Sequence, residues 1–393
     1  MNPSAAGWVD KFGHLVKDRD LYFTSFESLY DQLRSTGFVY GINLNVPDFI
    51  VIEHAMSEDE MAKINLLTGL YYTHRFIYGR SDFETFVKQL LKFYQGLDIH
   101  KDSFLNKLLT GKKTSAKLEM LINSRIYLED NLISKTFNST ITNSLLFIDL
   151  IAFERYLEGE RNVREIAQRL EYITINITYH TLSSKKKNRA DEKLEQLFAS
   201  SLTFIESRKK HFDGAYRNEL RPHSINENKY YLDVACLTAW EDHSLDYTES
   251  EFIFGLGKEL GFDRMDIAKS LADVTLFFEL NASKIPHLRD QGMAVQFYES
   301  MAKIVDKLIL RNSKRLQKEL SESKELVTLL SYSTVRDLTP GEKKKVQNQL
   351  LDIFKSIPSL AIFLLPGGAV LLPIFIKLIP KLLPSSFDEN RVE

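Results

Sequence analysis

The stretch SIPSLAIFLLPGGAVLLPIFIKLIPKLLPSSF, residues 356–387, decides what kind of helical protein this chain is. The run between Lys355 and Lys377 contains no charged residue. As one continuous helix it would be roughly 30 Å long, close to the thickness of the hydrocarbon core of a bilayer. Prolines interrupt the run, however, and the sequence PGG at 366–368 lies near its middle.

Three interpretations of this run differ in what surrounds it. It forms a buried hairpin in a soluble core, a single kinked helix across a membrane, or a re-entrant loop that enters a membrane and returns. In a membrane, the backbone groups freed near the prolines would need partners from neighbouring helices or water. Because no polar residue marks a solvent-facing side of the run, we expect a membrane segment, spanning or re-entrant.

Composition places most of the chain in water and in a reducing compartment. Its 393 residues exceed the usual size of one domain, and 44% hydrophobic and 26% charged residues are ordinary fractions. The formal net charge of −2 gives no reason to expect a DNA partner. The single cysteine, Cys236, is expected to be a buried thiol. The N-terminus lacks the apolar core of a signal peptide, so we expect most of the chain in the cytoplasm.

Helical periodicity dominates the chain before the apolar run. Segments such as DEMAKINLLTGLYYTHRFIYG (59–79) carry apolar residues three and four positions apart. This pattern predicts an all-α fold, a multi-helical soluble region with a C-terminal membrane segment interrupted by Pro and Gly. We expect four parts: a helical N-terminal domain (1–215), a second helical unit (225–290), a basic helix with a capped helix (295–355), and the apolar segment (356–387).

The third part contains one long helix and one clear helix start. The long helix is expected from about Val295 to Leu330. The next begins in LTPGEKKKVQNQLLDIFK (338–355), where Thr339 is placed as N-cap and Pro340 as first helical residue. Glu342 stands where a capping box requires an acid, so a helix is predicted to lead directly into the apolar run.

The end of the apolar segment, LLPIFIKLIPKLLPSSF (371–387), resembles the end of the membrane helix in the LETM family of leucine-zipper, EF-hand-containing mitochondrial inner-membrane proteins. Together with the helix before it, the segment is similar to bacterial relatives described as LETM-related and biofilm-associated. The matching positions are Leu371, Leu372, Pro373, Lys377, Pro380, Leu383, Pro384, Ser385 and Phe387. With the preceding Pro366, Gly367 and Gly368 they form the predicted membrane motif.

This resemblance implies a membrane segment and two family activities. One is the exchange of potassium or calcium against protons, and the other is ribosome binding, by a region that largely follows the membrane helix. Family members carry a glutamate in the span where Ala369 or Val370 stands here. An intramembrane carboxylate is the expected carrier of a proton or cation, so we rank exchange second.

The stretch YYLDVACLTAWEDHSLDYTESEFIFGLGKELGF (230–262) resembles the TerB-like helical domain of tellurite-resistance proteins. Its acidic turn carries Asp242, Asp246 and Glu249 at the family's acidic positions. Three carboxylates this close would suit Ca²⁺ or Mg²⁺, the only cofactor that we consider. The alternative is helix capping, with Asp246 as N-cap and Glu249 three residues later.

A series of cations precedes the capped helix at helical spacing. The predicted basic face consists of Lys303, Lys307, Arg311, Lys314 and Lys318. A solvated face is the default interpretation of such spacing. Contact with anionic lipid headgroups or with RNA phosphates is the alternative, because the helix lies close to the apolar run.

The sequence contains no catalytic signature. It has no GxGxxG, P-loop, HExxH or paired CxxC motif, and we expect a protein that is not an enzyme. The leading hypothesis is a cytoplasm-facing, LETM-like protein anchored in the inner membrane, with an interaction role or a role in envelope or ion homeostasis. Expected partners are membrane lipid and either the ribosome or another membrane protein. The alternatives are a subunit of a cation/proton exchange system and a soluble helical scaffold with the tail buried.

Overall fold

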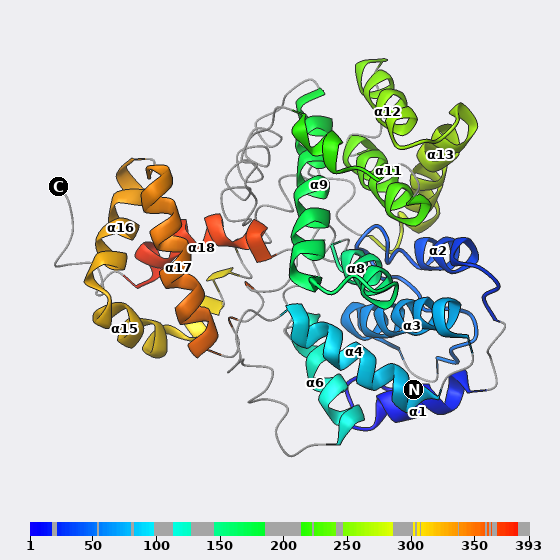
Figure 1. Ribbon diagram of the computed structural model, residues 1–393, viewed down its shortest axis with the longest axis horizontal. Coiled ribbons are helices and arrows are strands. Elements are labelled where there is room, and N and C mark those ends of the chain that lie inside the picture. The colour runs from blue at the N-terminus through cyan, green and yellow to red at the C-terminus, as the bar shows by residue number, and fades with distance from the viewer. Residues whose placement is uncertain are drawn as a thin grey trace.

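The computed structural model describes most of the chain in separate ranges. These are residues 1–17, 22–52, 55–79, 82–97, 113–126, 145–184, 214–221, 224–240, 247–285, 302, 305–306, 308–336, 338–357, 360, 363 and 368–383. Every regular element in these ranges is a helix, which confirms the all-α prediction. Figure 1 shows the helices in two groups, α1 to α13 on the right and α15 to α18 on the left.

We call the larger group the N-terminal body. Its helices are α1 (Trp8–Val16), α2 (Phe26–Ser35), α3 (Glu58–Tyr78), α4 (Phe83–Leu97), α6 (Thr114–Arg125), α8 (Phe147–Leu157), α9 (Val163–Ser184), η2 (Ala215–Glu219), α11 (Ile225–Ala239), α12 (Tyr247–Glu259) and α13 (Arg264–Asn281). We call the smaller group the C-terminal unit. Its helices are α15 (Ser313–Glu322), α16 (Lys324–Val335), α17 (Pro340–Ser356) and α18 (Gly368–Leu382).

Aromatic side chains join distant helices of the N-terminal body. The Phe147 ring of α8 lies edge-on to Tyr30 of α2, with centroids 5.2 Å apart, and stacks on Tyr230 of α11 at 5.3 Å. All three rings are fully buried. Helix α11 therefore shares a core with helices on the other side of residues 215–225. The domain boundary that the sequence places there stays a prediction.

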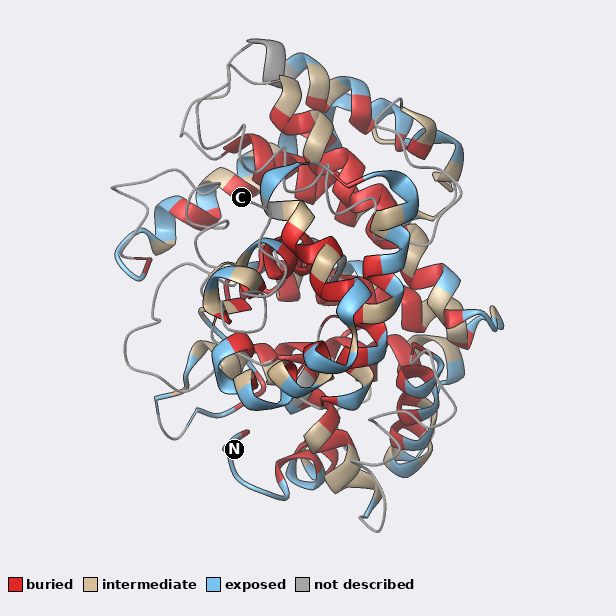
Figure 2. Cartoon of the chain, turned by 90° about the vertical axis from the view of Figure 1, so that its left-hand side faces the viewer, coloured by how far each residue is buried: buried red, intermediate tan, exposed pale blue. Residues whose placement is uncertain are grey.

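Buried and exposed faces alternate along most helices, as amphipathic periodicity requires. Figure 2 shows the buried residues gathered where helices meet and the exposed residues on the outer faces. Cys236 of α11 is fully buried, which confirms the expected buried thiol. Helix α3 also buries polar groups, including Asn65, whose amide nitrogen donates to the Asn43 side chain at 2.9 Å. This pairing offsets part of the cost of burying the two amides.

The single long helix predicted to reach Leu330 is wrong in its second half. Helix α15 ends at Glu322 and α16 begins at Lys324, because Ser323 between them has the non-helical angles φ −124° and ψ 76°. The Ser323 hydroxyl donates to the side chain of Gln349 in α17 at 2.9 Å. This contact joins the break to α17, and the break lets α16 pack against α15 and α17.

The second half of the apolar run lies in helix α18 of the C-terminal unit. The buried side chains of this helix are Leu371, Leu372, Pro373, Ile374, Phe375, Ile376 and Ile379, and Leu383 directly after it is buried too. Helix α18 packs against α16. Within the described ranges, no helix combines the length and the apolar composition needed to cross a membrane.

Candidate functional site

Helix α17 begins where the sequence predicts. The Thr339 hydroxyl accepts from the Glu342 backbone N–H at 3.4 Å, and the Glu342 carboxylate accepts from the Thr339 N–H at 2.8 Å. This capping box and Pro340 at the first turn confirm the predicted start. Arg336 adds a two-point ion pair with Glu342, at 2.7 and 2.9 Å. The Arg336 hydrogen bonds lower the pKa of the Glu342 carboxyl to about 2, so it stays ionised at neutral pH.

An aromatic cluster fixes α18 to α17. Phe354 of α17 stacks on Phe363 with centroids 4.4 Å apart. Phe375 of α18 lies across both rings at 5.1 Å. All three side chains are buried, and each such aromatic pair contributes about 1 kcal/mol beyond its buried area. The apolar run thus supplies the core of a helical unit in this structure.

Polar contacts at the surface join the other helices of the unit. The Glu325 carboxylate of α16 pairs with Lys345 of α17 at 2.7 Å and accepts from the Gln349 amide at 2.9 Å. At the other end of α17, the Ser356 hydroxyl donates to Glu319 of α15 at 2.9 Å. Helix α15 is therefore held against α17 from the side.

Helix α15 presents cations on its outer face. Leu316 and Leu320 are buried, and the polar positions between them face outward. The exposed cations of this segment are Arg311, Lys314, Arg315 and Lys318, at spacings of three, one and three residues. We call these four residues the α15 cationic face. Arg315 extends the predicted face, whereas Lys303 and Lys307 lie outside the described residues.

Helix α18 adds two cations to the surface of the same unit. Lys377 and Lys381 are exposed and stand one helical turn apart, next to the partly buried Pro380. Pro373 and Pro380 lie inside the helix, where each removes one backbone donor. Gly368 begins the helix. Pro366, Gly367, Pro384 and Phe387 of the predicted membrane motif lie outside the described residues.

The acidic turn of the TerB-like stretch falls almost entirely outside the structure. Asp242 and Asp246 are not among the described residues, and of Glu249 only the backbone, in α12, is described. Within the described part of the chain, no group of His, Cys, Asp or Glu side chains is arranged to hold a metal ion. The calcium or magnesium site stays a prediction of the sequence.

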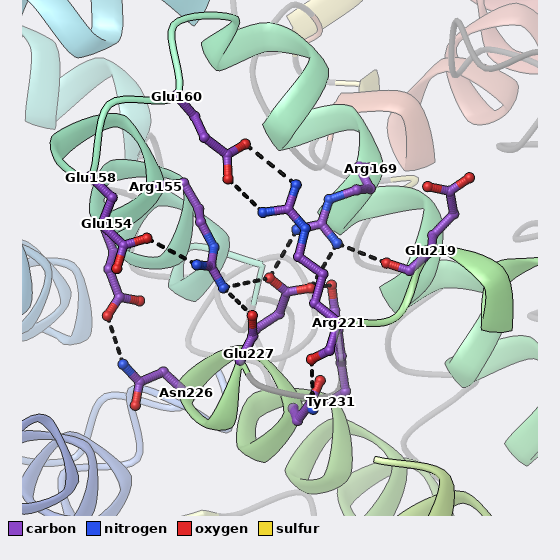
Figure 3. Close-up of polar contacts among 12 residues, drawn as sticks. Glu154, Arg155, Glu158, Glu160, Arg169, Glu219, Arg221, Asn226, Glu227 and Tyr231 are labelled. Carbon is purple, nitrogen blue, oxygen red and sulfur yellow. Dashed lines mark hydrogen bonds and ion pairs between the residues drawn. The ribbon is translucent and has the colours of Figure 1, made fainter. Parts of the chain in front are cut away.

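The N-terminal body contains a buried ion-pair network that sequence reasoning missed. The Glu227 carboxylate of α11 is fully buried and accepts two hydrogen bonds from Arg169 of α9, both at 2.8 Å. Arg155 of α8 approaches the same carboxylate at 3.4 Å, and Tyr231 donates to it at 3.2 Å. Figure 3 shows these side chains converging from three helices. One carboxylate thereby joins α8, α9 and α11.

Glu154 lies at the edge of this network. Its carboxylate accepts from the Asn226 amide at 2.7 Å (Figure 3). Burial raises the pKa of the Glu154 carboxyl to about 7, against the opposing effects of Asn226 and Arg155. Arg155 also pairs with the half-exposed Glu158 at 2.9 Å. The network therefore contains an acid that titrates near neutral pH.

Comparison with known proteins finds one similarity, in the C-terminal unit. Residues 338–393 match the LETM1-like ribosome-binding domain, described as LETM1-like, RBD. No curated protein and no solved structure matches the chain.

The match begins before the apolar run. The family resemblance implies a ribosome-binding region that largely follows the membrane helix, whereas the match begins at Leu338, one residue before the N-cap Thr339. It therefore includes both α17 and α18. Helix α15 lies outside the match and contacts it through Ser356 and Glu319. The resemblance to the LETM family thus has support over this part of the chain.

Proposed function

We propose that the C-terminal unit binds the ribosome and that the α15 cationic face contacts phosphates of ribosomal RNA. The match of residues 338–393 to the LETM1-like ribosome-binding domain carries the first part of this proposal. The exposed cations on α15, packed beside the matched helices, support the second. Phosphate contacts supply much of the affinity of proteins for nucleic acids and make it dependent on salt.

The charge distribution of the unit favours this role over a merely solvated face. Lys314, Arg315 and Lys318 occupy two successive turns of α15 and point away from the buried Leu316. Arginine and lysine on a rigid helix can meet several phosphates without rearrangement. The chain as a whole is slightly acidic, so attraction to RNA would depend on this local surface.

The test is co-sedimentation of the full chain with purified bacterial ribosomes at increasing salt. Arg311→Gln, Lys314→Gln, Arg315→Gln and Lys318→Gln are combined in one variant. We expect this variant to bind at least tenfold more weakly and with a shallower salt dependence. The matched control removes four exposed cations from the N-terminal body, through Lys17→Gln, Lys92→Gln, Arg161→Gln and Lys258→Gln. We expect the control to bind like the parent.

A third variant separates the two parts of the proposal. It removes Lys344, Lys377 and Lys381, three of the exposed lysines of the matched helices, each by replacement with Gln, and leaves Lys345 in its ion pair with Glu325. If only this variant loses binding, the ribosome contact lies in the matched region and the role of α15 is wrong. If the parent does not sediment with ribosomes, the proposed function is wrong.

A second candidate is attachment to the cytoplasmic face of the inner membrane through the apolar run. The observation that favours it is the uncharged run from Ile357 to Ile376, followed by exposed Lys377 and Lys381, which suit lipid headgroups. Insertion would require α18 to leave its contacts with α16 and α17. Retention of the full chain in membranes after alkaline carbonate washing would support this candidate, and complete extraction would reject it.

Both candidates assign the chain a binding role and no catalytic activity. His74, buried among aromatic rings, pairs with Gln89 at 2.8 Å, and burial lowers the pKa of its imidazole. A role in ion or envelope homeostasis, in biofilm formation or in cation/proton exchange rests on the family resemblance alone.

A further inference from the structure

Helix α13 carries an apolar stripe that faces away from the N-terminal body. The stripe contains Met265, Ala268, Ala272, Leu276 and Leu280, all exposed. Their spacings of three or four residues place them along one side of the helix. Met265 is 81% exposed, Leu276 51% and Leu280 71%, which are large values for such side chains. Adjacent apolar side chains exposed in this way mark interaction surfaces.

The opposite side of α13 is firmly attached to the body. Phe277 packs on Tyr40 with ring centroids 5.0 Å apart, and Phe278 stacks on Trp240 at 4.0 Å. Asp273 pairs with Arg34 of α2 at 2.7 Å. These contacts fix which side of the helix faces outward. Figure 1 shows α13 at the edge of the N-terminal body, on the side away from the C-terminal unit. The stripe is therefore separate from the proposed ribosome-binding surface.

Two charged residues interrupt the stripe at opposite ends. Lys269 lies near its start and Glu279 near its end, and both are exposed. Among the described residues, neither forms an ion pair. Ten residues of helix separate them, a rise of about 15 Å, so they cannot pair with each other within one chain. The stripe is thus positive towards one end and negative towards the other.

The stripe is complementary to itself when two copies lie antiparallel. With a two-fold axis at the level of residue 274, Ala272 of one copy faces Leu276 of the other, and Ala268 faces Leu280. The same register places Lys269 opposite Glu279. Because the contact is symmetric, each of these pairs occurs twice. Small residues opposite large ones let the helices approach closely, and the ion pairs at both ends select the antiparallel orientation.

We propose that two copies of this chain associate through α13, packed antiparallel along the stripe. The stripe is one helix wide, so the interface is small and the dimer is weak, with a dissociation constant on the order of tens of micromolar. Self-association is independent of ribosome binding, since α13 and the α15 cationic face lie on different parts of the molecule.

The experiment is analytical ultracentrifugation of the full chain from 1 to 300 µM, about the range a weak dimer requires. We expect the sedimentation coefficient of the parent to rise with concentration towards that of a dimer. Leu276→Glu places a carboxylate at the centre of the contact twice, and we expect it to abolish the rise. Val51→Glu, at a comparably exposed valine outside the stripe, is the matched control and is expected to dimerise like the parent.

A charge exchange tests the orientation. Lys269→Glu alone and Glu279→Lys alone each place like charges opposite one another, and we expect roughly tenfold weaker association. The double exchange restores both opposite-charge pairs, and we expect it to recover the parent's association. Lys269 and Glu279 are too far apart to interact within one helix. Recovery in the double exchange would therefore show that they face each other in an antiparallel pair of copies.

Three results would overturn the proposal. These are a parent that stays monomeric at all concentrations, association that survives Leu276→Glu, and a double exchange no stronger than the single ones. Circular dichroism of each variant shows whether it is folded, which is expected because every altered side chain is exposed.

Discussion

The N-terminal body buries carboxylate–guanidinium pairs, whereas the described helices of the C-terminal unit keep all their charged side chains at least partly exposed. In the body, Glu227 meets two arginines, and Asp149 of α8 pairs with Arg125 of α6 at 2.8 Å. In the C-terminal unit, the buried aliphatic and aromatic side chains come from α15, α16, α17 and α18. Buried charges demand partners of fixed geometry, while exposed ones remain available to a binding partner.

The largest expected effect comes from removing a buried charge in the N-terminal body. Glu227→Gln keeps the shape of the side chain but leaves Arg155 and Arg169 without a buried counter-charge. We expect the free energy of unfolding to fall by about 4 kcal/mol, measured by urea denaturation. The matched control is Glu325→Gln, which removes the exposed partner of Lys345 and is expected to leave the free energy of unfolding almost unchanged, because exposed ion pairs contribute little. Equal losses for the two variants would contradict the comparison.

The next effect concerns the apolar core of the C-terminal unit. Phe375→Ala removes a buried ring that lies across Phe354 and Phe363, and we expect a loss of about 3 kcal/mol. Hydrogen exchange measured by mass spectrometry should show faster exchange in α16 to α18 and unchanged protection in α3 and α8. If protection in α18 is unchanged too, Phe375 does not contribute to a packed core, and the membrane interpretation of the run gains support.

The start of helix α17 could be predicted because it depends on neighbours in the sequence, with Thr339 and Glu342 three residues apart. The predicted basic face stays a prediction, although Arg311, Lys314 and Lys318 are exposed. Glu227 could not be recognised, because Arg169 and Arg155 are 58 and 72 residues away in the chain. The contact of Ser323 with Gln349 likewise joins residues that are 26 positions apart in the chain.

The surroundings of the apolar run could not be predicted for a different reason. A helix that is apolar on all sides satisfies a protein core and a lipid phase equally well. Only the positions of α16 and α17 show that Ile374, Phe375 and Ile379 are covered by protein in this structure. The boundaries of the predicted domains and the acidic turn stay predictions.

The smallest expected effect sharpens the comparison through pH. The pKa of the Glu154 carboxyl is about 7 in the folded chain and near 4.5 when unfolded, so the folded state binds the proton more tightly. The protonated Glu154 carboxyl therefore stabilises the fold. This stabilisation is lost as the carboxyl ionises, when the pH rises from about 5 to 8. We expect Glu154→Gln to remove this loss, a gain on the order of 2 kcal/mol at pH 8. Denaturation at pH 5 and pH 8 measures it, and a parent and variant with parallel pH dependence would contradict it.

The burial of Cys236 has a practical consequence for kinetic experiments. It is the only cysteine in the chain, it lies fully inside α11, and burial raises the pKa of its thiol well above the ordinary range. In the closed state, the thiol is shielded and almost none of it is the reactive thiolate. A thiol reagent can therefore react only when the surrounding helices open. The rate at which Cys236 is labelled in the unaltered chain therefore measures how often the N-terminal body opens. A cysteine introduced at an exposed position of α15 would react at once, so a single fluorophore could be attached there without a competing background.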